Sequence, residues 1–374
     1  MRQIIRARWA VAAIFCTNGA AIGIWAANIP GVRERLALDP QVLSFGFLAM
    51  AVGALIGMPL GGWLIAHMGS ARVTLLSGIA MLTLLPVPVL APHFGMLVLG
   101  LWLFGLANGT MDVAMNAHGV LVEHKIDRPV MSSFHAMWSI GGLAGSALGG
   151  WALMQFAPTL TIAAAALLGL AAFGLAVPSL LNTNLDKQAG ESHFALPKRV
   201  SLALGLLAFL AMMSEGAILD WSGVYLRDLR ATPALAAAGF AGFSATMAFG
   251  RFFGDALRHK FGAGFLVRLS GMISAAGLAL ALIAPTPLLA VFGFAAMGIG
   301  IANIAPVIYG AAGRLKGVAS GVSIASVITL GYAGFTAGPP VIGFVAEQVS
   351  LRGGLALIGL ACLAIAALSS AAET

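Results

Sequence analysis

The sequence predicts an all-α membrane protein with twelve membrane-spanning helices, arranged as two pseudo-symmetric six-helix bundles. The first observation is composition: 60% of the residues are hydrophobic and 9% are charged, with a mean hydropathy of +0.98, whereas a soluble domain carries about 25% charged residues. The second is a series of apolar segments, each close to the roughly 20 residues that a span requires. The third is a set of glycine positions that repeats between the two halves of the chain.

Twelve apolar segments are the candidate spans. The first follows a basic flank, as a secretory signal would, but its removal would leave an odd number of spans, so we predict that it is retained. We expect Pro306 to kink the tenth span, and Pro339 and Pro340 to bend the eleventh. The segments begin near Trp9, Val42, Val73, Met96, Met131, Leu160, Val200, Leu235, Phe265, Leu288, Val318 and Leu355.

Lysine and arginine are unevenly distributed between the two sides of these spans. Of the 20 basic residues, 14 fall on one side and 5 on the other, and Arg251 lies inside a span. The positive-inside rule assigns the richer side to the cytoplasm. The net charge of +7 therefore reflects orientation in a lipid bilayer and not a nucleic-acid partner. We expect a monomer in the bacterial inner membrane with both termini in the cytoplasm.

A polar stretch from Asn182 to Arg199 divides the chain near its middle. We predict an N-terminal bundle at 1–185, a cytoplasmic linker at 186–199 and a C-terminal bundle at 200–374. Parallel repeats of this kind build transporters with a substrate site between the halves. The glycine pairs that share one offset of 193 residues are Gly61 and Gly254, Gly69 and Gly262, Gly105 and Gly298, Gly141 and Gly334, and Gly145 and Gly338.

These features together resemble the major facilitator superfamily, over essentially the whole chain. The signature loop of that family follows the second span, where this chain reads GGWLIAHMGSAR and has Ala66 in place of the family's Asp. The second copy, GRFFGDALRHKFG, is the better match, and we expect Arg251 to pair with Asp255 in it. In the family this loop is a conformational latch, so the resemblance implies a weaker latch in the first half. The latch residues that it implies are Gly62, Gly69, Arg72, Arg251, Asp255 and Arg258.

Asp112 is an acidic residue inside the apolar run 96–122, with Asn108 and Asn116 four residues to either side. On a helix these three side chains share one face. A charge inside a span is costly and usually functional, and burial disfavours the ionised form of a carboxylate, so Asp112 suits a proton carrier. A structural hydrogen bond to a neighbouring helix is the alternative. The motif ANGTMDVAMNAHG resembles the acidic-then-Asn pair of the branch that contains fucose permease, MosC and YbjJ, which implies a binding role for Asn116.

Other polar and aromatic side chains in the spans are candidates to bind a solute. Amides offer both donors and acceptors to hydroxyl groups, and aromatic faces stack on the apolar faces of sugars. Helix packing through buried amides and anchoring of tryptophan at the membrane surface are the competing explanations. Glu215, in the seventh span, is a second candidate for proton coupling. The full set of predicted substrate-binding residues is Asn18, Trp25, Asn108, Asn116, His135, Trp138, Asn303 and Tyr309.

The leading hypothesis is a secondary active transporter that moves a small hydroxylated solute, such as a sugar, polyol or inositol derivative, together with a proton. The alternative is a proton-coupled exporter, because the glycines at 141, 145, 149 and 150 match the spacing of the antiporter signature, although Ser146 replaces its proline. An intramembrane aspartyl protease would need Gly-x-Gly-Asp, but Phe252 replaces the first glycine. The sequence contains no phosphate-binding loop, metal-ligand cluster or nucleophile elbow, so we expect no enzyme activity, cofactor or metal. A receptor that binds solute without moving it is separated from these only by a transport assay.

Overall fold

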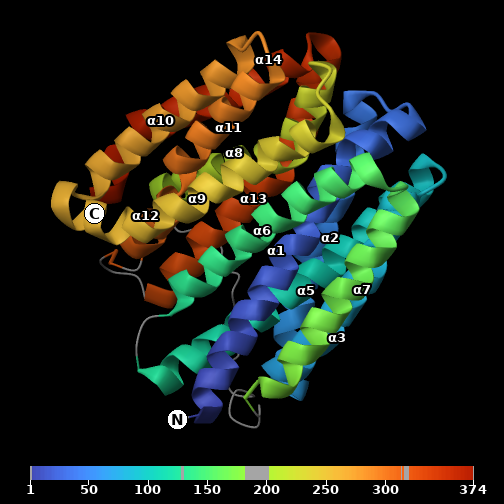
Figure 1. The fold of residues 1–374 in the computed structure, drawn as a ribbon. Coiled ribbons are helices and arrows are strands. Elements are labelled where there is room, and N and C mark those ends of the chain that lie inside the picture. The colour runs from blue at the N-terminus through green and yellow to red at the C-terminus, as the bar shows by residue number, and fades with distance from the viewer. Residues whose placement is uncertain (1, 128–129, 182–201, 313, 316–319, 374) are drawn as a thin grey trace. The chain divides into compact units, whose positions relative to one another are not determined.

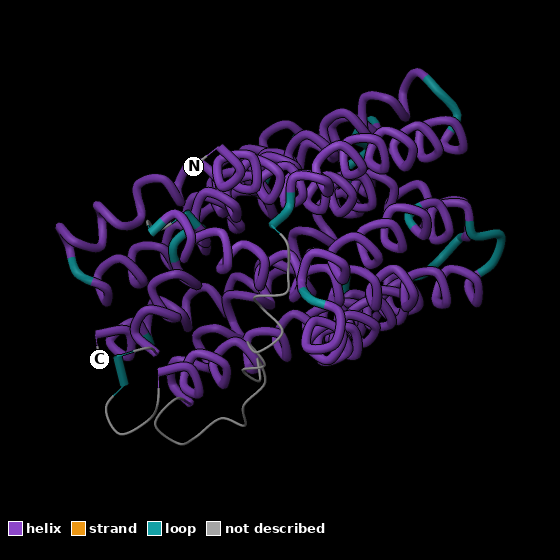
Figure 2. Tube along the Cα trace, turned by 90° about the horizontal axis from the view of Figure 1, so that it is seen from below, coloured by secondary structure: helices purple, strands orange, loops and turns teal. Residues whose placement is uncertain are grey.

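The computed structural model describes residues 2–127, 130–181, 202–312, 314–315 and 320–373. In these ranges the chain is helical nearly throughout, and Figure 2 shows helices joined by short loops, with no strand along the coloured trace. A chain in lipid must satisfy its backbone hydrogen bonds internally, and helices do so within one segment. The all-α prediction is therefore confirmed.

The first half of the chain contains seven α-helices and a short 3₁₀ turn within its described residues. They are α1 (Arg2–Leu36), α2 (Pro40–Met68), α3 (Ser70–Leu84), α4 (Pro86–Leu90), α5 (Phe94–Ile126), α6 (Met131–Gln155), α7 (Pro158–Ala176) and η1 (Val177–Ser179). The second half contains α8 (Leu202–Asp228), α9 (Pro233–Phe261), α10 (Ala263–Ile283), α11 (Pro287–Ile301), α12 (Ile304–Ala312), α13 (Ser320–Gln348), α14 (Leu351–Ala367) and η4 (Ser369–Glu373).

Ten helical stretches in the described residues are long and apolar enough to cross a membrane, with α3–α4 and α11–α12 each forming one stretch. Together with α6, of 25 residues, and α14, of 17 residues, they correspond to the twelve expected spans. The expected starts at Val200 and Val318 lie outside the described residues, as does the predicted linker at 186–199. Five of the basic residues used for orientation lie outside them too, namely Arg128, Lys187, Lys198, Arg199 and Lys316.

The tenth expected span breaks in two, as Pro306 predicts. Ala302 and Asn303 separate α11 from α12. A proline ring clashes with the carbonyl four residues earlier, which here belongs to Ala302. The eleventh span differs, because α13 continues as one helix through Pro339 and Pro340.

The chain divides into two compact units. The first comprises Met1–Ala37 and Ala49–Glu191, and the second comprises Leu38–Leu48 and Ser192–Thr374. In the first unit α1 packs along α6, and α3 packs against α5 (Figure 1). In the second unit α13 packs along α8, and α10 contacts both α11 and α14. Each unit thus builds its core from long helices in contact along their faces.

The repeat predicted from glycine positions also holds for the packing inside each unit. A Cβ atom on Gly105 would overlap the carbonyl oxygen of Met50, and a Cβ on Gly298 would overlap that of Phe243. Met50 and Phe243 are themselves separated by the offset of 193 residues. Small residues let helix backbones approach closely in membranes, so the repeated glycines mark repeated helix crossings.

The same offset relates the two turns that precede α3 and α10. Gly69 has φ 83° and ψ 154°, and Gly262 has φ 85° and ψ 162°. Residues with a side chain rarely adopt this backbone region. Both positions therefore require glycine for the same geometric reason.

Candidate functional site

Asn18 joins three helices of the first unit through its side-chain amide. It lies on α1 and is only 3% exposed. Its Nδ2 donates to Asn108 Oδ1 on α5 at 3.0 Å, and its Oδ1 accepts from Trp138 Nε1 on α6 at 2.8 Å. Three residues that the sequence predicted separately as substrate ligands thus form one hydrogen-bonded network.

Two methionine sulfurs complete the surroundings of Asn18. Met81 Sδ lies 3.3 Å and Met111 Sδ 3.5 Å from Asn18 Nδ2, and both side chains are fully buried. Sequence reasoning missed them, because a methionine in an apolar span is indistinguishable from any other core residue. Since Asn18 is enclosed, Asn108 and Trp138 are the members of the network that keep accessible surface.

Asp112 and Asn116 form a second polar group along α5. Asn116 Nδ2 donates to Asp112 Oδ1 at 3.1 Å and to the Asp112 carbonyl oxygen at 2.8 Å. Asn108, Asp112 and Asn116 are all half-buried, whereas their neighbours Met111 and Met115 are buried. The predicted polar stripe therefore lies on one partly accessible face of α5.

Other predicted residues of the first unit make local contacts. Trp25 is fully buried, and its indole nitrogen has no hydrogen-bond partner among the described residues. His135 is exposed, and its ring meets that of Phe15 edge-on at 5.3 Å between ring centres. Arg72, the basic residue of the predicted latch, is exposed, and Gly62 has open space where a Cβ would lie.

His118 is the buried histidine of the first unit, and sequence reasoning did not select it. It is 0% exposed. Leu181 N–H donates to its Nε2 at 3.1 Å, and Ser70 Oγ lies 2.8 Å from its Nδ1. Because Nε2 accepts, the neutral ring carries its proton on Nδ1 and donates to Ser70. His118 thereby links α5 to the start of α3 and to the chain that follows η1.

Replacing His118 by Ala should destabilise the protein. Leu181 and Ser70 would each lose a buried hydrogen-bond partner, and such a loss costs about 1–3 kcal/mol. Thermal unfolding of the purified protein in detergent measures this effect. His67→Ala is the matched control, because His67 is exposed and its ring nitrogen is hydrogen-bonded within its own helix, at Trp63 O. Equal unfolding temperatures for the two variants would contradict the assigned role of His118.

In the second unit, Glu215 on α8 interacts electrostatically with Arg251 on α9. Both side chains are half-buried. The sequence predicted that Arg251 pairs with Asp255, whose side chain lies outside the described part of the structure. Arg258 lies beside Gly310 of α12, where a Cβ would come within 2.9 Å of its guanidinium.

Asn303 is buried at the break between α11 and α12, where its Nδ2 donates to the Gly250 carbonyl at 3.0 Å. The corresponding contact in the first unit is Thr110 Oγ1 to the Gly57 carbonyl, also at 3.0 Å. All four residues obey the offset of 193 residues. Asn303 therefore ties α9 to the break as Thr110 ties α2 to α5, while Tyr309 of α12 is half-buried.

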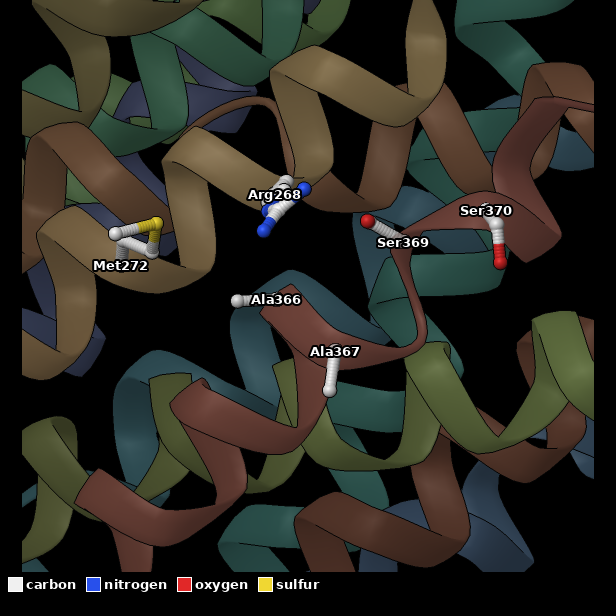
Figure 3. Close-up of a pocket in the computed structure, with 6 residues that line it drawn as sticks. All are labelled: Arg268, Met272, Ala366, Ala367, Ser369 and Ser370. Carbon is white, nitrogen blue, oxygen red and sulfur yellow. The ribbon is translucent and has the colours of Figure 1, made fainter.

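A cavity of about 350 Å³ lies in the second unit, at the end of α14 (Figure 3). It contains none of the predicted substrate or coupling residues, so the candidate ligands do not converge there. Among the described residues, no cluster of His, Cys, Asp or Glu could hold a metal ion. The residues that line this cavity are Arg268, Met272, Ala366, Ala367, Ser369 and Ser370.

Sequence comparison finds one family profile and several bacterial relatives. The profile of the Major Facilitator Superfamily matches residues 10–322. An uncharacterised transporter of Sinorhizobium fredii is 35% identical over 376 residues, which cover 99% of both chains. An uncharacterised MFS-type transporter of Yersinia pestis is 34% identical over 94% of this chain and 92% of its own. Membrane protein MosC of Rhizobium meliloti is 33% identical over 93% of this chain and 86% of its own.

Solved structures resemble this chain over nearly its whole length. A variant of the nucleoside transporter NupG superposes with a TM-score of 0.76 over 100% of both chains at 12% identity. A bacterial homologue of the human lysosomal transporter Spinster, inward-facing and unoccupied, gives a TM-score of 0.76 at 14% identity, over 99% of this chain and 97% of its own. At such identities the likeness concerns the fold alone.

Proposed function

The chain belongs to the major facilitator superfamily and is a membrane transporter, and from this premise we propose that it carries a small hydroxylated solute together with a proton. The resemblance read from the motifs, including that to the MosC-containing branch, is confirmed by the relatives. The family and its members are transporters and not enzymes. The proposed cargo is a sugar, polyol or inositol derivative, moved by alternating access.

The observation that carries this proposal is the Asn18–Asn108–Trp138 network beside the Asp112–Asn116 pair in the first unit. Polar side chains within spans are expensive and mark solute or ion pathways. The amides of Asn108 and Asn116 offer the donors and acceptors that hydroxyl groups need. The indole of Trp138, oriented by its hydrogen bond to Asn18, offers a flat apolar face to the C–H groups of a sugar.

We assign proton coupling first to Asp112. Its carboxylate accepts a hydrogen bond from Asn116, and it lies on the same helix face as Asn108. Binding of a solute at the amides would therefore alter the surroundings of the carboxylate directly. Glu215 is the second candidate, although Arg251 already opposes its charge.

The remaining assignments extend the proposal over both units. The buried indole N–H of Trp25 is available to donate a hydrogen bond to a solute hydroxyl. His135, Asn303 and Tyr309 remain candidate solute contacts. The signature glycines and basic residues would act as the latch of alternating access. We place the protein in the bacterial inner membrane as a monomer with both termini in the cytoplasm, because the basic residues are concentrated on that side.

The glycine pattern in α6 does not favour the exporter. A Cβ on Gly141 would overlap the carbonyl of Cys16 on α1, and one on Gly334 would overlap that of Phe209 in the second unit. Because both halves use the same close crossing, helix packing explains these glycines without an antiporter role. Export therefore remains only as an outcome of the transport assay.

The test is solute-triggered proton flux in proteoliposomes. Purified protein is reconstituted with a pH-sensitive dye inside, and a panel of sugars, polyols and inositol derivatives is added outside. We expect one class of solute to acidify the lumen, and protein-free liposomes to remain unchanged. Silence across the whole panel, together with proton release on addition of amphipathic cations, would replace this proposal by the exporter.

A further inference from the structure

Asp220 is a buried carboxylate near the end of α8. It is 5% exposed, and its neighbours Leu219 and Trp221 are 6% and 0% exposed. Among the described residues it has no hydrogen bond and no ion pair.

The other acid in the middle of α8 has different surroundings. Glu215 is half-buried and has Arg251 as an electrostatic partner. Five residues separate the two acids, and at 3.6 residues per turn they point about 140° apart. Arg251 therefore interacts with Glu215, whereas Asp220 lies on a different face of the helix.

Among the described side chains of the surrounding elements, no charged group forms a hydrogen bond or an ion pair with Asp220. α8 is packed against α9, α11, α12, α13, α14 and η4, and the start of α2 joins them through Phe47, whose ring meets that of Trp221. Tyr225, one turn further along α8, directs its hydroxyl to the carbonyls of Ala281 and Leu282. The titratable or charged residues of these elements and of α8 itself are Asp39, Glu215, Tyr225, Arg227, Asp228, Arg251, Asp255, Arg258, His259, Lys260, Tyr309, Tyr332, Glu347, Arg352, Cys362 and Glu373.

An ionised carboxylate without a partner is too costly to keep in an apolar interior, so the group takes up a proton instead. We infer that Asp220 is a proton-binding residue of the transport cycle, protonated in the conformation described here and deprotonated when helix movement opens it to water. The inference rests on the proposed proton-coupled transport and adds a carrier in the second unit. The carboxylate binds one proton from water and returns the same proton to water, so no other reactant is needed.

The first test separates coupling from solute movement. Asp220→Asn imitates the permanently protonated acid, so it should lose uphill accumulation driven by a pH gradient while solute counterflow, which moves no net proton, continues. Asp228→Asn is the matched control, because Asp228 is the exposed acid at the end of the same helix, and it should accumulate solute normally. Uphill accumulation by Asp220→Asn equal to that of the unsubstituted protein would overturn the inference.

The second test needs no solute. A protonated carboxyl gives a C=O stretching band in the infrared, and exposed aspartates lose theirs near their ordinary pKa of about 4. We expect a band that persists at neutral pH in the unsubstituted protein, is absent from Asp220→Asn and shifts in Asp220→Glu. A neutral-pH spectrum identical in Asp220→Asn and the unsubstituted protein would overturn the inference. If no solute is transported, the proposed function fails while this spectrum still decides the state of Asp220.

Discussion

Proteoliposomes that contain the Asp112→Asn variant should show no solute-driven acidification of the lumen. Asn keeps the size of the side chain and can still hydrogen-bond Asn116, whose Nδ2 lies 3.1 Å from Asp112 Oδ1. It cannot bind or release a proton, so coupling is lost while the polar stripe of α5 remains. The rate of dye response should fall to that of protein-free liposomes.

Asp39→Asn is the control for this experiment, because Asp39 is an exposed acid in the loop before α2. It should acidify the lumen as fast as the unsubstituted protein. Persistent acidification by Asp112→Asn would remove Asp112 from the coupling machinery. The proton would then be assigned to the acids of α8, namely Glu215 or Asp220.

Adding one methyl group at Gly141 should destabilise the fold strongly. A Cβ there would overlap the backbone carbonyl of Cys16, and backbone cannot swing aside as a flexible side chain can. Overpacking of a close-packed interior costs about 1–3 kcal/mol or more. Since α1 packs along α6, separating them at one crossing disturbs contacts along both helices. We expect Gly141→Ala to unfold at a clearly lower temperature in detergent.

Two further alanine variants sharpen this measurement. Gly174→Ala adds the same methyl group to α7, where nothing lies within 4 Å of the added atom, and it should unfold normally. Gly334→Ala should behave like Gly141→Ala, because its Cβ would overlap the Phe209 carbonyl at the equivalent crossing of the second unit. A Gly141→Ala variant as stable as Gly174→Ala would refute the close-crossing argument.

Hydropathy and the glycine repeat predicted the fold because both can be recognised in the sequence alone. Hydropathy is a property of contiguous segments, and the glycine repeat has one constant offset. Apolar segments of span length form helices in lipid since their backbone groups have no other partners. The offset of 193 residues then reappeared in contacts that the glycines alone did not specify, such as Thr110 with Gly57 and Asn303 with Gly250. The break at Ala302 and Asn303 likewise followed from the missing N–H and the ring of Pro306.

The pairing of polar side chains could not be predicted in this way. Asn18 lies 90 residues from Asn108 and 120 residues from Trp138 along the chain. Whether these side chains meet depends on how α1, α5 and α6 are rotated about their axes. A span that is apolar on every side gives little indication of which face it turns inward. For the same reason sequence reasoning selected His135 and not His118, although His118 is buried and hydrogen-bonded while His135 is exposed.

The sequence by itself determined the class of protein, the twelve spans, the internal repeat and the superfamily, because these follow from composition, periodicity and motifs along one chain. Only the tertiary structure decided which polar groups satisfy each other and which remain alone. Glu215 and Asp220 show the difference, since both are acids of one helix. Packing places Arg251 near Glu215, whereas it buries Asp220 without a hydrogen bond or ion pair among the described residues. The free-energy cost of a buried charge then distinguishes the two acids.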